Sequence, residues 1–554
     1  MTERQAARVG IEDVHALVDA LDEVVRAAVA SAAKKTDGGK DIDSWQVHSE
    51  RVAYAATEVL AARAMVEYAK AAGAGGADAT LFVDEAAVHA GETAAKLTGQ
   101  LVAAGDDFAL PAGLFEKTLG NDATRARIRA FACEDRVRSI GRAVAAQRGA
   151  HNAWLPEEDV VMVRDSVRAF AQKEVSPLAE RIHRHDELVP DSLIQAMAGM
   201  GYFGMSAPEE YGGLGMGNLA MVVTTEELSR VSLAAAGSLI TRPEILTKAL
   251  LKGGTEEQKK KWLAPVAAGE IMVGISVTEP NTGSDVASVA CRAEKAEVGG
   301  RAGFVINGAK AWCTFAGRAN VLALLARTDP DPKSGARGLS LFIVEKDAFG
   351  GHEFEMKQAT GGTLHGKADA TPGYRGMHSY TLAFENYFVP AENLIGGDKG
   401  LNKGFYLQMN GFAAGRMQTA GRATGLAQAA LEAASGYAVD RKQFGSPLVD
   451  FQLSQYKLGR MATATQVARQ ISYKAARAMD VDESISLEPA MAKLLTCDVA
   501  VAVTQEGQLL HGGWGYAEEY PISRYVVDAT VLPIFEGVKP ILELKVIARQ
   551  LLAA

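Results

Sequence analysis

The chain has few cysteines for its length, and their placement argues against two kinds of stabilised site. Four cysteines stand among 554 residues, at Cys133, Cys291, Cys313 and Cys497, and none forms a Cys-x-x-Cys pair. Disulfide frameworks and structural zinc sites both use cysteines at short, regular spacings. We therefore expect buried thiols in a reducing compartment, with neither a disulfide framework nor a metal site.

Long apolar runs and an excess of positive charge are also missing. No apolar run approaches the roughly 18 residues of a membrane span, and the N-terminal segment lacks the apolar core of a secretory signal. The formal net charge is −9, whereas nucleic-acid-binding proteins usually present a basic face. The composition predicts a cytoplasmic protein without a membrane or nucleic-acid partner.

The sequence is rich in alanine and other residues that favour helices, and its length predicts three or four domains. Apolar positions recur at helical spacing over residues 47–69, and a long helix is expected near 450–480. The glycine-rich strings DGGKD near Gly38 and GAGGAD near Gly75 predict loops between helices. Runs such as AGFVINGAKAWCTF and NVLALLART instead predict strands, with no helix between them long enough for a parallel crossover. We predict a mainly α protein with a central antiparallel β domain. Its parts are an N-terminal helical extension (1–150), an α domain (151–270), the β domain (271–397) and a C-terminal helical bundle (398–554).

A possible internal repeat links the two ends of the chain. The segment WQVHSERVAYAATEVLAAR (45–63) can be aligned with FQLSQYKLGRMATATQVAR (451–469). Alanine-rich helices also match by chance, so duplication and coincidence both stay open. If the repeat is real, the extension is a copy of part of the C-terminal bundle without its chemistry.

Two segments of the predicted β domain offer groups suited to a planar, polar ligand. SVTEPNTGSDVAS (276–288) supplies hydroxyls and backbone N–H groups in a loop after a strand, although an ordinary hydrogen-bonded turn uses the same residue types. In AKAWCTFAG (309–317), strand alternation places Trp312 and Thr314 on one face and Cys313 on the other. An indole and a hydroxyl there suit stacking on a ring and bonding to its edge. Packing of Trp312 in the core is the alternative.

Two segments of the C-terminal bundle carry further candidates. In AVDRKQFGSPLVDFQ (438–452), Arg441 follows a predicted helix and suits a diphosphate, although a solvated helix end is the simpler explanation. Glu536 follows apolar residues in PIFEGVKPILELKVIARQLL (533–552), and Pro540 fits the first turn of a helix. A carboxylate in this setting can serve as a general base. It can also merely complement the helix dipole.

A glycine-rich string at 212–217, GGLGMG, partly matches a dinucleotide-binding fingerprint. Such a fingerprint follows a buried strand directly and opens a helix. No strand pattern precedes this string, so we predict a turn.

Taken in order, five motifs resemble those of the acyl-CoA dehydrogenase family. They are TEPNTGSD, the Trp-Cys-Thr triplet, RKQFG, HGGWGY with EEYP, and Ile-Phe-Glu-Gly, and the resemblance covers about residues 155–553. It implies the family's α, β, α fold, FAD as cofactor, and α,β-dehydrogenation of an acyl-CoA thioester. In that reaction Glu536 takes the α-proton and the β-hydrogen leaves as hydride to the flavin.

The resemblance also implies binding roles for matched positions. Contacts to FAD are expected from Ile275, Val277, Thr278, Gly283, Ser284, Trp312, Thr314, Arg441, Gln443, Phe444, Gln452, Gly512, Gly513 and Val538. Of these, Arg441, Phe444, Gln452 and Gly513 match positions that reach the FAD of a neighbouring subunit. Contacts to the acyl-CoA are expected from Ser284, Arg416 and Gly537. Gly415 occupies the position of the base in some relatives, which leaves Glu536. Val538, Pro540 and Leu509 depart from the family pattern, which puts some FAD contacts in doubt.

The extension also bears on the acyl group. A chain of about this length with an N-terminal helical extension resembles the family members that convert (2S)-methylsuccinyl-CoA to mesaconyl-CoA. The segment 360–382 is also longer than the family's usual connection. The distal carboxylate of such a substrate needs a cationic partner, for which Arg242, His365 and Arg375 are candidates. Each of these residues could instead be a surface charge.

Two other functions remain open at this point. One is a short- or branched-chain acyl-CoA dehydrogenase with an uncharged acyl group. The other is a non-catalytic, flavin-bearing nucleic-acid-binding relative, which the negative charge disfavours. The resemblance implies an electron-transfer flavoprotein as electron acceptor. We expect a homodimer, because the extension could cover the surface that pairs dimers in other members.

Overall fold

The computed structural model describes residues 8–150 and 154–553, which form two compact units. One unit joins Met1–Met162 with Thr419–Ala554, and the other is Val163–Gln418. The predicted boundary between residues 150 and 151 falls beside 151–153, which lie outside the described residues. Within the described residues, no helix is both long and apolar enough to cross a membrane.

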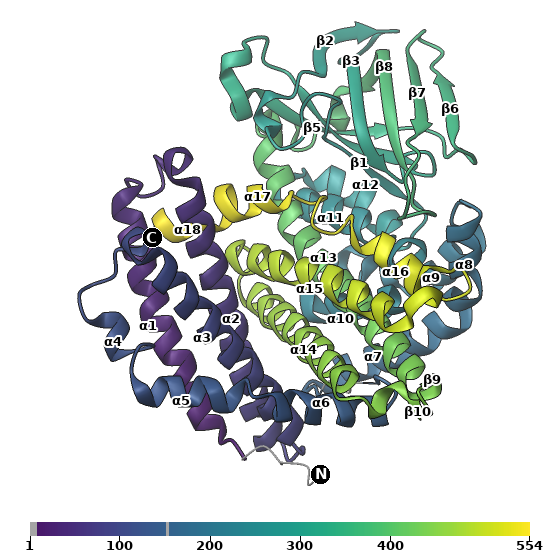
Figure 1. Cartoon of the computed structure of the whole chain (residues 1–554). Coiled ribbons are helices and arrows are strands. Elements are labelled where there is room, and N and C mark those ends of the chain that lie inside the picture. The colour runs from purple at the N-terminus through teal and green to yellow at the C-terminus, as the bar shows by residue number, and fades with distance from the viewer. Residues whose placement is uncertain (1–7, 151–153, 554) are drawn as a thin grey trace. The chain divides into compact units, whose positions relative to one another are not determined.

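The first unit is a helical bundle built from both ends of the chain (Figure 1). In it α2 packs against α1, α3 and α14, and α6 packs against α14. Its N-terminal helices are α1 (Ile11–Lys35), α2 (Gln46–Ala74), α3 (Thr80–Phe108), α4 (Leu114–Lys117), α5 (Asp122–Phe131) and α6 (Glu134–Ala146). Its C-terminal elements are α14 (Gln452–Val481), α15 (Leu487–His511), α16 (Ile522–Ala529), α17 (Lys539–Ile541) and α18 (Arg549–Ala553), with a small hairpin of β9 (Lys442–Gln443) and β10 (Ser446–Pro447). The helices α7 (Glu158–Phe170) and α13 (Gly404–Asp440) cross from one unit to the other.

The helix predicted around residues 47–69 is confirmed as α2, which runs for 29 residues without proline. Glycines lie at both predicted breaks, in the connections that follow α1 and α2. Gly38 and Gly39 have positive φ in the connection from α1 to α2, and Gly76 has positive φ in the connection from α2 to α3. Only glycine adopts such backbone angles at no steric cost, so these breaks could be read from the sequence.

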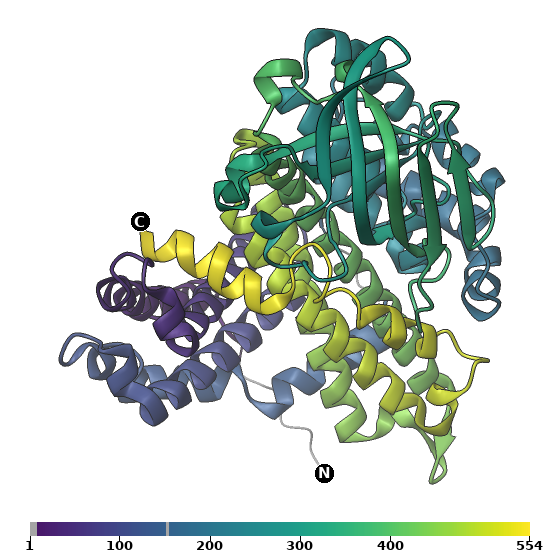
Figure 2. The same ribbon diagram turned by 90° about the horizontal axis from the view of Figure 1, so that it is seen from above.

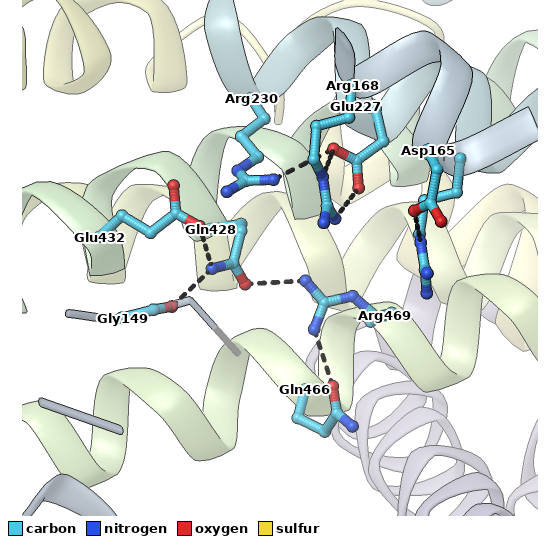
Figure 3. Close-up of polar contacts among 10 residues, drawn as sticks. Gly149, Asp165, Arg168, Glu227, Arg230, Gln428, Glu432, Gln466 and Arg469 are labelled. Atoms are coloured by element: carbon cyan, nitrogen blue, oxygen red, sulfur yellow. Dashed lines mark hydrogen bonds and ion pairs between the residues drawn. The ribbon is translucent and has the colours of Figure 1, made fainter. Parts of the chain in front are cut away.

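Close packing joins the N-terminal helices to the C-terminal bundle. A Cβ atom at Gly141 of α6 would lie 1.9 Å from the Gln455 carbonyl oxygen, and one at Gly459 of α14 would lie 1.9 Å from the Val137 carbonyl oxygen. The two helices can therefore approach only because both residues are glycine. Gly149 follows shortly after α6, and its carbonyl accepts a 2.8 Å hydrogen bond from the Gln428 side chain of α13 (Figure 3).

The proposed repeat pairs two helices of nearly equal length, α2 and α14. The aligned arginines have different partners. Arg63 pairs with Asp22 of α1, whereas Arg469 donates to the side chains of Gln466 and Gln428 (Figure 3). The duplication therefore stays a prediction.

The second unit holds a sheet in the order β1-β4-β2-β3-β8-β7-β6, with β5 added on β4. Figure 2 shows these strands lying side by side. The strands are β1 (Val273–Ser276), β2 (Arg292–Val298), β3 (Arg301–Thr314), β4 (Val321–Arg327), β5 (Leu339–Glu345), β6 (Glu353–Lys357), β7 (Thr363–Ala368) and β8 (Ser379–Pro390). The helices of this unit are α8 (Ser176–Arg184), α9 (Asp191–Gly199), α10 (Gly217–Val231), α11 (Thr241–Gly253) and α12 (Glu256–Ala267).

The predicted mainly α fold with a central antiparallel β domain is confirmed, and most pairings in the sheet are antiparallel. Two strands differ, because β1 and β2 each pair with β4 in parallel. The chain runs from β1 to β4 through the β2–β3 hairpin, so no crossover helix joins these two strands. Residues of α11 and α12, among them Leu246 and Trp262, share a buried cluster with Val273 and Leu341 of the sheet.

Two smaller features of this unit bear on the sequence analysis. The glycine-rich string at 212–217 follows a 3₁₀ turn (Glu209–Tyr211) and leads into α10, which confirms a turn. Arg168 of α7 and Arg230 of α10 both pair with the buried carboxylate of Glu227, so an ion-pair cluster braces these helices (Figure 3).

Candidate active site

Glu536 lies in the loop that connects α16 to α17 in the first unit. Its backbone has φ of +56°, and the next residue, Gly537, has φ of +99°. A non-glycine residue at positive φ costs roughly 1–3 kcal/mol and persists only where its surroundings hold it. The loop must therefore be fixed by contacts elsewhere in the unit.

Lys493 of α15 supplies such contacts. Its ammonium group donates to the Phe535 carbonyl at 2.7 Å and to the Gly537 carbonyl at 2.6 Å, so it grips the backbone on both sides of Glu536. The side chain is only 1% exposed. Sequence reasoning missed Lys493, although a lysine inside the apolar run PAMAKLLT is a signal in itself.

Other contacts secure the two ends of the loop. The Lys539 amide donates to the Pro533 carbonyl at 2.9 Å, which closes the loop on itself. The Cys497 thiol contacts the Leu532 carbonyl at 3.4 Å, and the Arg422 guanidinium lies over the Phe535 ring at 4.7 Å. A half-buried carboxylate on a fixed, strained loop is well suited to accept a proton from a bound substrate.

In the second unit, the loop that carries Thr278, Gly283 and Ser284 is closed at its base by a buried ion pair. Lys310 of β3 is 0% exposed and donates to the Val277 carbonyl at 2.9 Å and to the Glu279 carboxylate at 3.0 Å. The same carboxylate accepts the backbone N–H groups of residues 290 and 291, both at 2.8 Å. The base of the loop is thereby satisfied, while Gly283 and Ser284 are exposed at its tip.

Trp312 leaves the core at a β-bulge. The pairing of β3 with β8 shifts register between Lys310 and Cys313, and Trp312 has φ of +56° with 59% of its surface exposed. Core packing of Trp312 is therefore wrong. Thr314 lies nearly buried beside it, within 2.9 Å of the Ser379 hydroxyl. Bulges next to functional sites commonly re-aim one side chain in this way.

The remaining predicted cofactor residues lie mostly on exposed backbone. Phe444, at the tip of the β9–β10 hairpin, is 95% exposed with φ of +52°, and Arg441, Gln443, Gln452, Gly512 and Gly513 are exposed as well. A Cβ atom at Gly512 or Gly513 would meet nothing within 4 Å. Val538 and Ile275 are half-buried and Val277 is buried, with its carbonyl already bound by Lys310. Exposed aromatic rings, a guanidinium and open backbone fit a large, flat, anionic cofactor such as FAD.

The three predicted cations for a distal carboxylate lie in different surroundings. Arg242 of α11 is 4% exposed; it donates to the Ser238 carbonyl at 3.1 Å and lies 6.0 Å from the Tyr374 ring. Within the described residues, its guanidinium makes no ion pair with a carboxylate. His365 is half-exposed at the sheet surface and contacts Glu353 at 3.1 Å, as a surface charge would.

Arg375 is engaged with its own neighbours. It lies 3.3 Å from the Asp186 carboxylate and donates to the His183 carbonyl at 3.1 Å. The same carboxylate contacts His378 at 3.1 Å. Asp186, His378 and His352 place one ligand atom each within 4.8 Å of one another, but the guanidinium already supplies the positive charge there. Arg416, the predicted substrate contact on α13, is buried.

One further buried lysine supports the strand ends near Trp312. Burial lowers the pKa of Lys346 to about 7. Its ammonium group donates to the Gly317 and Ala319 carbonyls at 3.1 and 2.8 Å, which holds the turn that follows β3.

Comparisons with known proteins show which family the chain resembles. Three family models match in order: "Acyl-CoA dehydrogenase, N-terminal domain" at 157–270, the middle domain at 274–387 and the C-terminal domain at 402–552. The chain is 44% identical over 397 residues to (2S)-methylsuccinyl-CoA dehydrogenase of Cereibacter sphaeroides. The alignment covers 72% of this chain and 70% of that one.

Solved structures agree. A glutaryl-CoA dehydrogenase in complex with glutaryl-CoA matches with 30% identity and a TM-score of 0.65, over 72% of this chain and 97% of that one. A chain from a study of the electron transferring flavoprotein of Acidaminococcus fermentans matches with 31% identity and a TM-score of 0.64, over 72% and 98%. The family models leave residues 1–156 unmatched. From residue 157 onward the chain carries the family's domains in order, and it belongs to the acyl-CoA dehydrogenase family.

Proposed function

We propose that this protein is an FAD-dependent dehydrogenase of (2S)-methylsuccinyl-CoA, which it converts to mesaconyl-CoA. The observation that carries the reaction is Glu536, a half-buried carboxylate held at positive φ by a lysine that grips both flanking carbonyls. The likeness to a methylsuccinyl-CoA dehydrogenase supports the substrate. Residues 1–150 are then an extension added to the three domains of the family.

In the proposed reaction, Glu536 removes the α-proton of the thioester. The backbone N–H of Glu536 is the proposed donor to the thioester oxygen, and loss of one such donor typically costs about 2.7–4 kcal/mol. The rigid loop supplies the placement that proton transfer requires, because reacting atoms must already lie within hydrogen-bonding reach. FAD, when bound, supplies the hydride acceptor for the β-hydrogen.

The proposed residues that hold FAD have suitable chemistry. Thr278 and Ser284 offer hydroxyls from a loop whose base is already satisfied by Lys310. Trp312 offers an exposed indole that can stack on a flat ring. Arg441 is the proposed contact to phosphate oxygens, which a guanidinium binds in pairs.

Arg242 is the proposed partner of the distal carboxylate. A buried guanidinium without a carboxylate loses hydration that an anionic ligand would replace, so a dicarboxylic acyl group should bind more tightly than an apolar one. Arg375 and His365 are weaker candidates, because each already contacts an acidic side chain. A relative crystallised with glutaryl-CoA, another dicarboxylic thioester by name, is consistent with this choice.

Electrons are proposed to pass to an electron-transfer flavoprotein, which is consistent with the structural match from a study of such a protein. We also propose a homodimer. Light scattering of the purified protein at known concentration tests the assembly, and a tetramer would contradict it.

The decisive experiment is anaerobic bleaching of the purified protein's flavin absorbance by a panel of acyl-CoAs. (2S)-Methylsuccinyl-CoA should bleach the flavin fastest, with butyryl-CoA and isovaleryl-CoA slower. Arg242→Met should raise KM for methylsuccinyl-CoA about 10- to 100-fold and leave butyryl-CoA nearly unchanged. Arg375→Met is the matched control, since that arginine already has Asp186 as partner.

A strong preference for an uncharged acyl chain would instead favour a short- or branched-chain acyl-CoA dehydrogenase. No bleaching with any thioester, together with a salt-dependent shift of DNA or RNA in a gel, would favour the nucleic-acid-binding relative.

A further inference from the structure

A side chain of the N-terminal extension connects to the loop of Glu536 through two short polar contacts. The Tyr54 hydroxyl, on α2, donates to the Asp498 carboxylate on α15 at 2.6 Å. The same carboxylate oxygen accepts from the Lys539 ammonium group, also at 2.6 Å. Lys539 begins α17, three residues after Glu536. The path from the extension to the base therefore consists of two hydrogen bonds and three residues of chain.

The surroundings of Tyr54 keep its hydroxyl a donor. Burial and the neighbouring Asp498 carboxylate raise the pKa of Tyr54, so the phenol stays protonated. Two ammonium groups lie over its ring, that of Lys96 at 4.4 Å and that of Lys539 at 5.1 Å. Lys96 is in turn paired with Glu58 at 2.8 Å. Tyr54 thus lies between Lys96 of the extension and Lys539, the residue that directly follows the loop of Glu536 (530–538, here called the base loop).

The loop is consequently anchored at two points by one helix. Lys493 of α15 holds the carbonyls of Phe535 and Gly537, and Asp498, five residues further along α15, holds the side chain of Lys539. The first anchor comes wholly from the part of the chain that matches the family models. The second is completed by Tyr54, which lies in the part that those models leave unmatched.

A second tie acts on the segment after Lys539. The helix α2 packs against the π-helical segment Leu542–Ala548 that continues from α17. Lys545 of this segment pairs at 2.5 Å with Asp43, which lies in the 3₁₀ turn (Ile42–Trp45) before α2. The extension therefore contacts the chain on the C-terminal side of Glu536 through more than one residue.

We propose that Tyr54 is a positioning residue for Glu536, and that the extension holds the base loop through Asp498 and Lys539. The inference rests on the proposed function, in which Glu536 is the base. Without the Tyr54 hydroxyl, the Asp498 carboxylate has one donor fewer and holds Lys539 less firmly. A loop at positive φ then relaxes toward lower-energy backbone angles, which moves the carboxylate away from the α-carbon.

Two phenylalanine substitutions on the same helix form the test. Tyr54→Phe removes the hydroxyl that reaches Asp498. Tyr68→Phe is the matched control, because the Tyr68 hydroxyl accepts from the Trp154 amide at 2.8 Å and, among the residues that the structure describes, makes no hydrogen bond to the loop of Glu536. The full-length holoprotein is used throughout, and flavin content and melting temperature are measured for every variant.

Tyr54→Phe should lower kcat about 10-fold with KM changed by less than about twofold, since a hydrogen bond to a charged group is lost. A primary isotope effect with α-deuterated substrate should rise, because proton abstraction becomes slower. Amide hydrogen exchange of residues 533–541, measured without substrate, should be faster than in Tyr68→Phe. Asp498→Asn should show the same pattern more strongly, and Asp498→Glu should restore part of kcat.

The inference is overturned if Tyr54→Phe and Tyr68→Phe have equal kcat and equal exchange at 533–541. It is also overturned if both variants lose flavin and melt early to the same extent, since Tyr54 then contributes only to folding. Failure of the proposed function looks different: the unmodified protein would not oxidise any acyl-CoA, while the exchange difference between the two variants would persist.

Discussion

Two loops of this protein are each held by a buried lysine that grips backbone carbonyls, and the grips differ. Lys493 binds the carbonyls on both sides of Glu536. Lys310 binds one carbonyl, that of Val277, together with the carboxylate of Glu279. In the first loop the bound carbonyls lie on both sides of Glu536, the proposed catalytic base. In the second loop the bound groups join the two ends of the loop, and its exposed tip is left for a ligand.

The difference indicates what each lysine does. The two carbonyls that Lys493 binds fix the backbone on both sides of the proposed catalytic base, so loss of Lys493 should affect catalysis more than stability. A buried lysine paired with a carboxylate leaves an uncompensated charge when it is removed, which destabilises the fold strongly. Substitutions at and around these residues test this division.

The largest effect is expected at Glu536, which lies between the two carbonyls that Lys493 binds. Glu536→Gln should lower kcat at least about 10³-fold, because the amide cannot take the α-proton. Flavin absorbance and melting temperature should stay close to those of the unmodified protein. Stopped-flow bleaching measures the rate, and retained turnover would show that another residue is the base.

Lys310→Met should cost about 3–5 kcal/mol of unfolding free energy, because Glu279 is left buried without its partner. Flavin affinity should fall with it, since the loop of Thr278 loses its closure. The double variant Lys310→Met with Glu279→Gln should recover part of the stability. Chemical denaturation measures all three, and equal losses in the single and double variants would rule out a charge penalty.

Lys493→Met should lower kcat about 100-fold, because the carbonyls that flank Glu536 lose their common donor. Its cost in stability should be smaller than that of Lys310→Met. Lys493→Arg should recover little, since a planar guanidinium cannot replace a compact ammonium group in a buried site. The proposed difference between the two lysines is contradicted if Lys493→Met unfolds most of the protein while the folded fraction keeps its flavin and its kcat.

The smallest effect concerns pH. Burial raises the pKa of Glu543 from 4.5 to about 7, although Lys539 opposes the rise. A carboxyl group that binds its proton more tightly when folded stabilises the protein at low pH, and this contribution is lost as pH rises from about 4.5 through about 7. Glu543→Gln should therefore flatten the pH dependence and raise the melting temperature at pH 8. An unchanged pH profile would show that Glu543 is ionised in the folded protein at all these pH values.

Sequence patterns predicted the long helices and the strands rich in β-branched residues. They could not predict contacts between residues that lie far apart in the chain. Apolar periodicity located α2 and α14, and β-branched runs located β3 and β4. The strand β2, with sequence RAEKAEV, was missed because it is largely charged and exposed on alternate positions. It forms because β3 pairs with it along its whole length.

The candidate site divides in the same way. Glu536, Trp312 and Arg441 lie in motifs that can be recognised along the chain. Tyr54 and Asp498 are separated by 444 positions, and no local pattern could have paired them. The outward turn of Trp312 was also beyond strand alternation, since a register shift in the pairing with β8 produces it.

By itself, then, the order of residues determined which segments become helix or strand, because backbone periodicity is a local property, and it determined which carboxylate is the candidate base. Only the folded chain decided what holds that carboxylate in place. The reason is that polar side chains take their hydrogen-bond partners from whatever lies beside them in space, and here Tyr54 meets Asp498 from the opposite end of the polypeptide.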